Sequence, residues 1–270
     1  MPGYIAPEAL IPLIGSADCP VLVDVRRADV FNASAVRLPA ALWRDHRAVE
    51  TWLSEILPVR PVVVYCAHGH NVSEIAAASL RQAGRDVAVL SGGIGAWIEM
   101  GGPTISNGMR ALEPGLPSAT VWVTRQRPKI DRVACPWLIR RFIDSGAVFH
   151  FVAAEQVLAV AEETGWIPFD VEGAFYSHRD ERCSFDTLIE EAGLVEPALF
   201  HLARIVRGAD TARLDLEPES AGLLAVSLGL SAIEPDDLAQ MQKAMPIYDA
   251  LLGWCRHATA ERHNWPAAIR

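Results

Sequence analysis

The sequence lacks an excess of positive charge. Its 33 acidic side chains outnumber the 24 basic ones, which gives a net charge of −9 at pH 7. A protein that binds nucleic acid needs a positively charged surface to neutralise the phosphates. The composition therefore argues against nucleic acid as a partner.

Cysteines are few, and their number is odd. The five are Cys19, Cys66, Cys135, Cys183 and Cys255, with no regular spacing between them. Disulfide-bonded secreted domains usually carry an even number of cysteines at framework spacings. The sequence therefore predicts reduced thiols and a cytoplasmic protein.

Long apolar runs, internal repeats and low-complexity tracts are also missing. The first 15 residues contain three prolines and Glu8, without a basic flank, so they resemble neither a signal peptide nor a membrane span. Apolar residues make up 51% of the chain and charged residues 21%, which is typical of a folded protein with ordinary cores. We therefore expect a soluble chain of two domains with no membrane partner.

Strand and helix patterns alternate in the first half of the chain. The predicted strands are 21–25, 61–65 and 86–90, and the predicted helices are 47–57, 71–84 and 92–101. Such alternation is typical of a parallel sheet with helices on both faces. We predict an α/β domain over residues 1–103.

The second half is dominated by helical patterns. Residues 104–119 are rich in glycine and proline and predict a linker. The predicted elements after it are strands at 120–124 and 147–152 and helices at 131–146, 185–193, 196–210, 218–230 and 235–257. Because Pro136 suits a first turn, we expect the helix there to begin near Cys135. The pattern predicts a helix-rich α+β domain over residues 120–270.

The first candidate site is Cys66, between a predicted strand and a predicted helix. Such a turn gathers backbone N–H groups and the positive end of the helix dipole, which stabilise a thiolate and can hold an anion. Gly69 gives the turn access to positive φ, and His68 and His70 add further donors. On spacing alone, a buried core cysteine fits equally well.

Four stretches make the first half resemble the rhodanese family over residues 5–103. They are LVDVR at 22–26, RLPAA at 37–41, YCAHGHN at 65–71 and LSGGIGAW at 90–97. The resemblance implies that Cys66 takes sulfane sulfur as a persulfide and passes it to a thiol or cyanide. The expected anion-binding loop is Ala67, His68, Gly69, His70 and Asn71. Asp24 and Arg26 are expected to form a structural pair.

The loop length and one substitution refine this expectation. The six residues from Cys66 to Asn71 match the loop length of sulfurtransferases in the family, whereas relatives that act on phosphate or arsenate have one residue more. The family usually has arginine where this chain has Asn71, and serine where it has Val72. Without the guanidinium, a persulfide is the expected sulfur donor in preference to thiosulfate.

Two clusters stand out in the second half. Arg132, Arg140 and Arg179 belong to a basic group that could bind an oxyanion near a helix N-terminus, although a solvated basic face is favoured on pattern alone. His178, Cys183 and Asp186 are candidate ligands for zinc or ferrous iron. Their spacing matches no closed structural zinc site, so a hydrogen-bonded histidine and a buried cysteine are favoured before any resemblance is considered.

Residues 120–258 resemble the C-terminal domain of chromate-resistance proteins of the ChrB type. The matching stretches include DRVACPWLIRRFID, PFDVEGAFYSHRDERCSFDTLIE, IVRGADT and YDALLGWCRH. In that family the domain follows a DNA-binding domain and is associated with sensing chromate. Here a rhodanese-like half takes that place, so the resemblance does not imply a role in transcription.

Two functions follow as hypotheses. The first is a sulfurtransferase that uses Cys66, a thiosulfate or persulfide donor and a thiol acceptor, coupled to a chromate-resistance domain. The second is a non-catalytic sensor or binding protein for chromate-like oxyanions or a divalent metal. The sequence leaves the oligomeric state open.

Overall fold

The first half of the chain builds a five-stranded parallel sheet. The computed structural model describes residues 3–56, 60–112 and 119–261. The strand order is β1-β6-β5-β2-β4. The bounds are β1 Tyr4–Ile5, β2 Val21–Asp24, β4 Leu42–Trp43, β5 Val62–Tyr65 and β6 Val87–Leu90. The three central strands are valine-rich and buried throughout, as expected for a sheet covered on both faces.

Helices cover the two faces of this sheet. They are α1 Pro7–Leu10, η1 Ile11–Leu13, α2 Ala28–Asn32, α3 Val49–Trp52, η2 Leu53–Glu55, α4 Val72–Gln82 and α5 Gly93–Glu99. Val62 and Val64 pack with α3 and α4, whereas Val63 and Tyr65 face the cluster that contains α1 and α5. The predicted α/β class with helices on both faces is confirmed. The predicted helix at 47–57 is divided between α3 and η2, and residue 57 lies outside the described residues.

The second half combines a small parallel sheet, in the order β10-β8-β9, with long helices. The strands are β8 Val121–Arg125, β9 Val148–Val152 and β10 Ile167–Pro168; the helices are α6 Asp131–Leu138, the π-helix η4 Ile139–Ile143, η5 Ala154–Gln156, α7 Val157–Thr164, α8 Ser184–Ala192, α9 Pro197–Asp210, α10 Glu219–Ile233 and α11 Asp237–His257. The predicted helix-rich character is confirmed, although α7 was not predicted. Within the described ranges, no helix is both long and apolar enough to span a membrane.

The expected helix start near Cys135 is wrong. The helix begins at Asp131 and contains Pro136 in its interior. Its start is set by tertiary contacts, because the Asp131 carboxylate accepts hydrogen bonds from the backbone N–H groups of Ser184 and Phe185 on α8. After the proline, which cannot donate a helical hydrogen bond, the chain continues as the π-helix η4.

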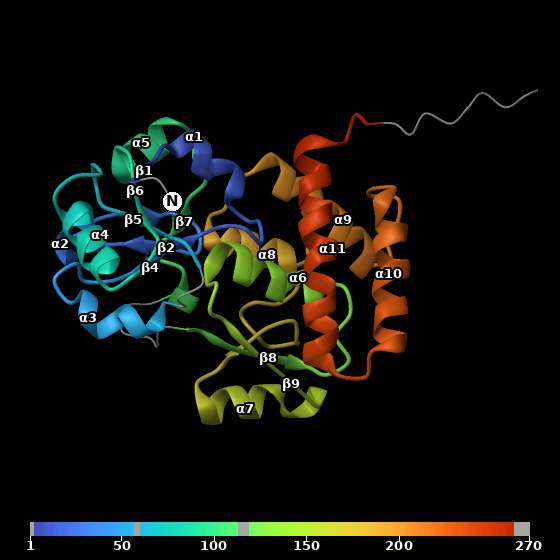
Figure 1. Cartoon of the computed structure of the whole chain (residues 1–270). Helices are drawn as coiled ribbons and strands as arrows, with labels where there is room; N and C mark the ends of the chain where they lie inside the picture. The colour runs from blue at the N-terminus through green and yellow to red at the C-terminus, as the bar shows by residue number, and fades with distance from the viewer. Residues whose placement is uncertain (1–2, 57–59, 113–118, 262–270) are drawn as a thin grey trace, which may run out of the picture.

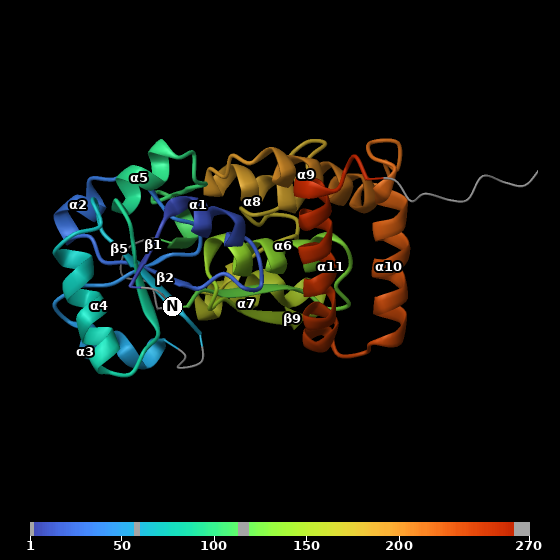
Figure 2. The ribbon, with the colours of Figure 1, turned by 45° about the horizontal axis from the view of Figure 1, so that its top comes forward.

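The two halves share one hydrophobic core. A single cluster contains Leu10 and Trp97 from the first half and Trp137 and Phe142 from the second. Figures 1 and 2 show the halves side by side, with α6 and α8 next to the first sheet and α10 on the far side. Backbone contacts cross the junction, since Ala40 N–H donates to the Phe142 carbonyl at 2.7 Å.

The described part of the predicted linker is structured. It contains β7, Ile105–Ser106, which pairs antiparallel with β3, Val36–Arg37, and it contains the short helix η3, Arg110–Leu112. Residues 113–118 of this predicted linker lie outside the described residues. The domain boundaries 1–103 and 120–270 stay a prediction.

Candidate functional sites

The Cys66 loop links the end of β5 to the start of α4 and rests against α5. Ile94 N–H donates to the Cys66 carbonyl at 3.0 Å, and Gly95 N–H donates to the Ala67 carbonyl at 3.1 Å. Gly69 has φ +72°, and a Cβ there would lie 2.6 Å from the Leu90 carbonyl oxygen. Only glycine fits this approach, because the neighbouring atoms are backbone. The loop is therefore held in one conformation around the thiol.

Hydrogen bonds converge on the Cys66 thiol, which is only 6% exposed. Its Sγ lies 3.2 Å from Ser73 Oγ, and the protonated thiol donates to the His70 carbonyl oxygen at 3.2 Å. Burial alone would raise the pKa of Cys66, but hydrogen bonds from the Ser73 side chain and from the backbone at His68, Ser73 and His70 outweigh it and lower the pKa. The site favours the thiolate, which is the nucleophilic form.

The remaining predicted loop residues act through the backbone. The side chains of His68, His70 and Asn71 are exposed. Asn71 has φ +40° and caps α4, and its N–H donates to Glu74 Oε2 at 3.1 Å. Sequence reasoning missed Ser73, whose signal was a lone serine in the first turn of an alanine-rich helix.

Asp24 and Arg26 form a buried ion pair beside this loop. The guanidinium Nε and Nη2 both donate to the Asp24 carboxylate, at 2.5–3.0 Å. Arg26 Nη2 also donates to the Val36 carbonyl on β3, at 3.1 Å. The pair connects the end of β2 to β3, and an open pocket of about 460 Å³ lies between Arg26 and the loop residue Ala67.

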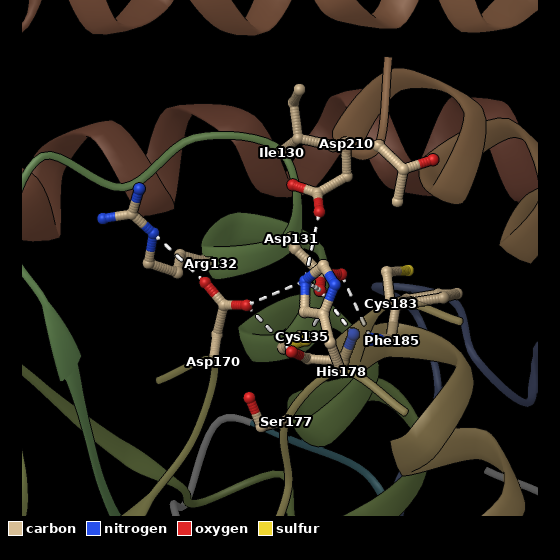
Figure 3. A network of polar contacts seen from close by, with 12 residues as sticks. Ile130, Asp131, Arg132, Cys135, Asp170, Ser177, His178, Cys183, Phe185 and Asp210 are labelled. Carbon is tan, nitrogen blue, oxygen red and sulfur yellow. Dashed lines mark hydrogen bonds and ion pairs between the residues drawn. The ribbon is translucent and has the colours of Figure 1, made fainter. Parts of the chain in front are cut away.

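In the second half, three carboxylates surround one imidazole nitrogen. His178 Nε2 lies 3.5 Å from Asp131 Oδ2, 3.3 Å from Asp170 Oδ1 and 3.2 Å from Asp210 Oδ2. Figure 3 shows the histidine ring between these aspartates. Asp131 begins α6, Asp170 follows β10 and Asp210 ends α9, so three separate parts of the fold meet at His178.

The proton equilibria of this cluster are strongly perturbed. Burial and the neighbouring carboxylates of Asp170 and Asp210 raise the pKa of Asp131 to about 8. Hydrogen bonds to Asp170 and Asp210 raise the pKa of His178 to about 10. Burial disfavours ionised Asp170, but hydrogen bonds from His178 and Ser184 outweigh it and lower its pKa. The cluster therefore holds a cation, here the imidazolium, among carboxylates.

The predicted ligand set of His178, Cys183 and Asp186 is not assembled. Among the described residues, the potential ligand atoms that gather around His178 belong to Asp131 and Asp170. Cys183 is fully buried and its Sγ lies 3.4 Å from Asp186 Oδ2, while Asp186 also pairs with Arg207 at 3.3 Å. Cys183 and Asp186 contact each other at the N-cap of α8, where the Cys183 backbone N–H donates to Asp186 Oδ2. The His178 ring contacts other carboxylates, so the three predicted ligands do not form one site.

The predicted oxyanion-binding arginines are also dispersed. Arg132 Nε lies 3.3 Å from Asp170 Oδ2. Arg140 donates to the Ala147 carbonyl at 3.1 Å and lies over the Phe149 ring, and Arg179 pairs with Glu191 at 2.6 Å. Their charges are used in separate internal contacts, so these three arginines do not form one anion site.

Sequence reasoning also missed Asp131, Asp170 and Asp210. Each lies in a different segment, and no short motif connects them. Asp131 stands next to Arg132 at the start of the predicted helix, so its charge did not distinguish it from a solvated helix start.

Each half of the chain is similar to a known family. Residues 7–100 match the family model of the rhodanese-like domain, and residues 122–255 match that of the ChrB C-terminal domain. Protein ChrB of Cupriavidus metallidurans is 35% identical over 131 residues, which are 48% of this chain and 39% of that protein. The chain thus spans less than half the length of this relative.

Solved structures similar to the first half have low overall superposition scores. A protein of unknown function from Rhodopseudomonas palustris, described as a possible tyrosine phosphatase, is 27% identical with a TM-score of 0.33 and covers 37% of this chain and 81% of its own. A rhodanese-related protein from Thermoplasma volcanium is 24% identical with a TM-score of 0.34, and the match covers 41% of this chain and 98% of that one.

Proposed function

We propose that this chain, which combines a rhodanese-like domain with a ChrB C-terminal domain, is a sulfurtransferase with Cys66 as its nucleophile. The observation that carries the proposal is the hydrogen bonding around Cys66 Sγ. Ser73 Oγ and the loop backbone lower the pKa of the thiol despite its burial. A thiol placed in this way is ionised more readily than an ordinary one, as nucleophilic catalysis by cysteine requires.

The transfer takes place in two displacement steps. The Cys66 thiolate attacks the outer sulfur of a donor persulfide, a new S–S bond forms, and the donor's own S–S bond breaks to release its thiolate. With thiosulfate as donor, sulfite is the leaving group. An acceptor thiolate then attacks the outer sulfur on Cys66 and releases the Cys66 thiolate. Neither step needs an external oxidant or reductant.

A specific sulfur adduct tests the proposal. The full chain is incubated with glutathione persulfide or with thiosulfate, the excess donor is removed, and the intact mass is measured. We expect one added sulfur on Cys66 in the wild type and none in Cys66→Ser, with the persulfide loading the protein more completely than thiosulfate. Cys183→Ser serves as a matched control that should load normally.

A different location of the sulfur would overturn the assignment. Sulfur found by peptide mapping only on Cys19 or Cys255 would mean that exposure, rather than the loop, decides reactivity. Transfer of the Cys66 sulfur to added dithiothreitol or cyanide is the second required result. A persulfide that no acceptor removes would contradict transferase activity.

The second candidate function is cation binding in the ChrB-type half. The observation that favours it is the meeting of Asp131, Asp170 and Asp210 at His178 Nε2, all within 3.5 Å. Imidazole and carboxylates suit zinc, ferrous iron or manganese. A chromate-like anion is disfavoured at this point, because the neighbouring carboxylates of Asp170 and Asp210 would repel it.

Calorimetric titration of untagged protein with Zn²⁺ or Mn²⁺ tests this function. We expect binding that releases protons, because a metal must displace the proton held by His178. Asp131→Asn and Asp170→Asn should each weaken binding, whereas Cys183→Ser should not. Equal binding by all three variants would place the metal elsewhere, and an absence of binding would leave a proton-holding ion cluster.

A further inference from the structure

A pocket of about 570 Å³ lies at the junction of the two halves, and its lining includes neither Cys66 nor His178. Its walls come from α2, β4 and α3 in the first half, from η3, and from residues near β8 and η4 in the second half. Most of its surface is apolar, with contributions from Phe31, Trp43, Leu112 and Ile143. This size and character are typical of sites for small organic molecules.

One charged side chain in the pocket wall has unused hydrogen-bonding capacity. Arg37 is only 7% exposed, and its Nε and Nη2 have no hydrogen-bond partner. Buried N–H groups of a guanidinium are almost always paired, because leaving them unpaired costs free energy. Burial also lowers the pKa of Arg37, which indicates that a negative partner would be favourable there.

Three other arginines of this chain show which group the Nε and Nη2 donors of a guanidinium bind together. Arg26, Arg141 and Arg256 each use Nε and Nη2 together to hold the two oxygens of one carboxylate. This fork-shaped pairing is the most specific mode by which arginine recognises a carboxylate. The same two donors of Arg37 are the ones without a partner.

The carboxylates in the pocket wall are already engaged: Glu55 pairs with Arg44, and Asp45 accepts a hydrogen bond from Arg47 N–H at 2.9 Å. Asp144 accepts hydrogen bonds from the N–H and hydroxyl groups of Thr120, at 2.6 and 2.8 Å, and from Gly146 N–H at 2.9 Å. Among the described residues, no salt bridge reaches Arg37. The same wall contains Asn107, whose Nδ2 donates to the Ser34 carbonyl at 2.9 Å while its buried Oδ1 has no partner.

We propose that this pocket binds a small organic acid with an apolar body. The carboxylate pairs with Arg37, the body packs against the apolar and aromatic wall, and a hydroxyl or amino group of the ligand donates to Asn107 Oδ1. Because the walls belong to both halves, such a ligand contacts the rhodanese-like half and the ChrB-type half at once.

The test uses mandelate, an aromatic hydroxy acid, as the probe on the full chain. Its binding is measured by isothermal titration and by the rise of the thermal midpoint, with benzyl alcohol and sulfate as parallel probes. We expect mandelate to bind and to raise the midpoint, benzyl alcohol to bind at least about tenfold more weakly, and sulfate to fail to compete. Sulfate that competes as well as mandelate would assign Arg37 to inorganic oxyanions and overturn the organic-acid proposal.

Variants place the probe in the pocket. Arg37→Met should weaken mandelate binding at least about tenfold, and Arg37→Lys should also weaken it, because lysine keeps the charge but lacks the fork. Arg47→Met is the matched control. It removes the same charge from an exposed side chain just before α3, and this variant should bind mandelate normally. If Arg37→Met does not fold, Arg37→Lys and Asn107→Leu decide the matter. Unchanged affinity in the folded variants, or no binding by the wild type, would overturn the proposal.

Discussion

Cys66 and Cys183 show how two similar positions give opposite thiol chemistry. Both cysteines are buried near the N-terminal end of a helix: Cys66 follows β5 and contacts Ser73 in the first turn of α4, and Cys183 is the N-cap of α8. Around Cys66 the partners are a hydroxyl and the loop backbone, and the pKa is lowered. Around Cys183, burial and the carboxylates of Asp131 and Asp186 raise the pKa well above its usual value. Position before a helix therefore does not by itself activate a thiol.

The difference lies in the charge that each neighbourhood already holds. Cys66 Sγ contacts the Ser73 hydroxyl and the loop backbone, and neither of these contacts is with a carboxylate. Cys183 lies near carboxylates, including those that contact His178, and they would repel a Cys183 thiolate. The same repulsion, after burial, raises the pKa of Cys135. The fold thus separates a thiolate site from a cation site.

The largest expected effect is a contrast in alkylation. At neutral pH, iodoacetamide should modify Cys66 at least about a hundredfold faster than Cys135 or Cys183, because those two are fully buried and remain protonated. A time course followed by peptide mapping measures the three rates. In denaturant they should become similar, and a native-state rate for Cys183 close to that of Cys66 would break the comparison.

The next effect concerns the shape of the loop. Gly69→Ala should lower the free energy of unfolding by ~3 kcal/mol or more, because its Cβ would meet backbone atoms that cannot give way. Gly84→Ala is the matched control, since Gly84 has a similar φ of +76° but nothing within 4 Å of the added Cβ. Its expected cost is ~1 kcal/mol. Urea unfolding compares the two variants. Equal losses of unfolding free energy would show that the positive φ, and not the contact with backbone atoms, causes the effect at Gly69.

A smaller effect is expected at Ser73. Ser73→Ala removes a hydrogen bond from Cys66 Sγ and should raise the pKa of that thiol. The pH dependence of Cys66 alkylation measures the shift. Ser79→Ala, on the same helix, should leave the profile unchanged. An unshifted profile in Ser73→Ala would assign thiolate stabilisation to the backbone alone.

The smallest effect is a pH dependence of stability in the second half. The raised pKa of His178 means that its pairing stabilises the fold fully below about pH 6.5 and that this is lost as the pH rises towards about 10. The raised pKa of Asp131 acts in the same direction up to about pH 8. The thermal midpoint should fall by a few degrees between pH 7 and 10, and less in His178→Gln than in the control His257→Gln. If the thermal midpoint depends on pH in the same way in the wild type and in His178→Gln, the pairing of His178 is not the cause of the fall.

The sequence predicted what depends on neighbouring residues. The valine-rich strands, the helices between them and the position of Cys66 at a strand end all follow from local patterns. The turn alone fitted an activated thiol and a buried core cysteine equally well, and the expectation of a nucleophile rested on the resemblance to the rhodanese family. The role of Ser73 was missed because the rotation of its side chain toward Cys66 depends on the angle between β5 and α4.

The cation site was only partly predictable, for the same physical reason. His178 was identified, but its neighbours Asp131, Asp170 and Asp210 are brought together by the packing of α6, α9 and the segment after β10. Cys183 and Asp186 were chosen because they are close in sequence, and their contact with each other is an N-cap interaction. Proximity along the chain predicts caps and turns well, and sites between elements poorly.

The shared core has a consequence for how the molecule unfolds. The ring of Phe142 from η4 lies directly over Gly15, where an added Cβ would be 2.3 Å from a ring carbon, and Arg256 on α11 donates to the Ile14 carbonyl at 2.9 Å. Exposing either half would uncover apolar surface that the other now buries, so opening the junction costs much of the core's free energy. The chain should therefore unfold as one cooperative unit with a single calorimetric transition. Any event that stabilises one half then protects the other to the same extent.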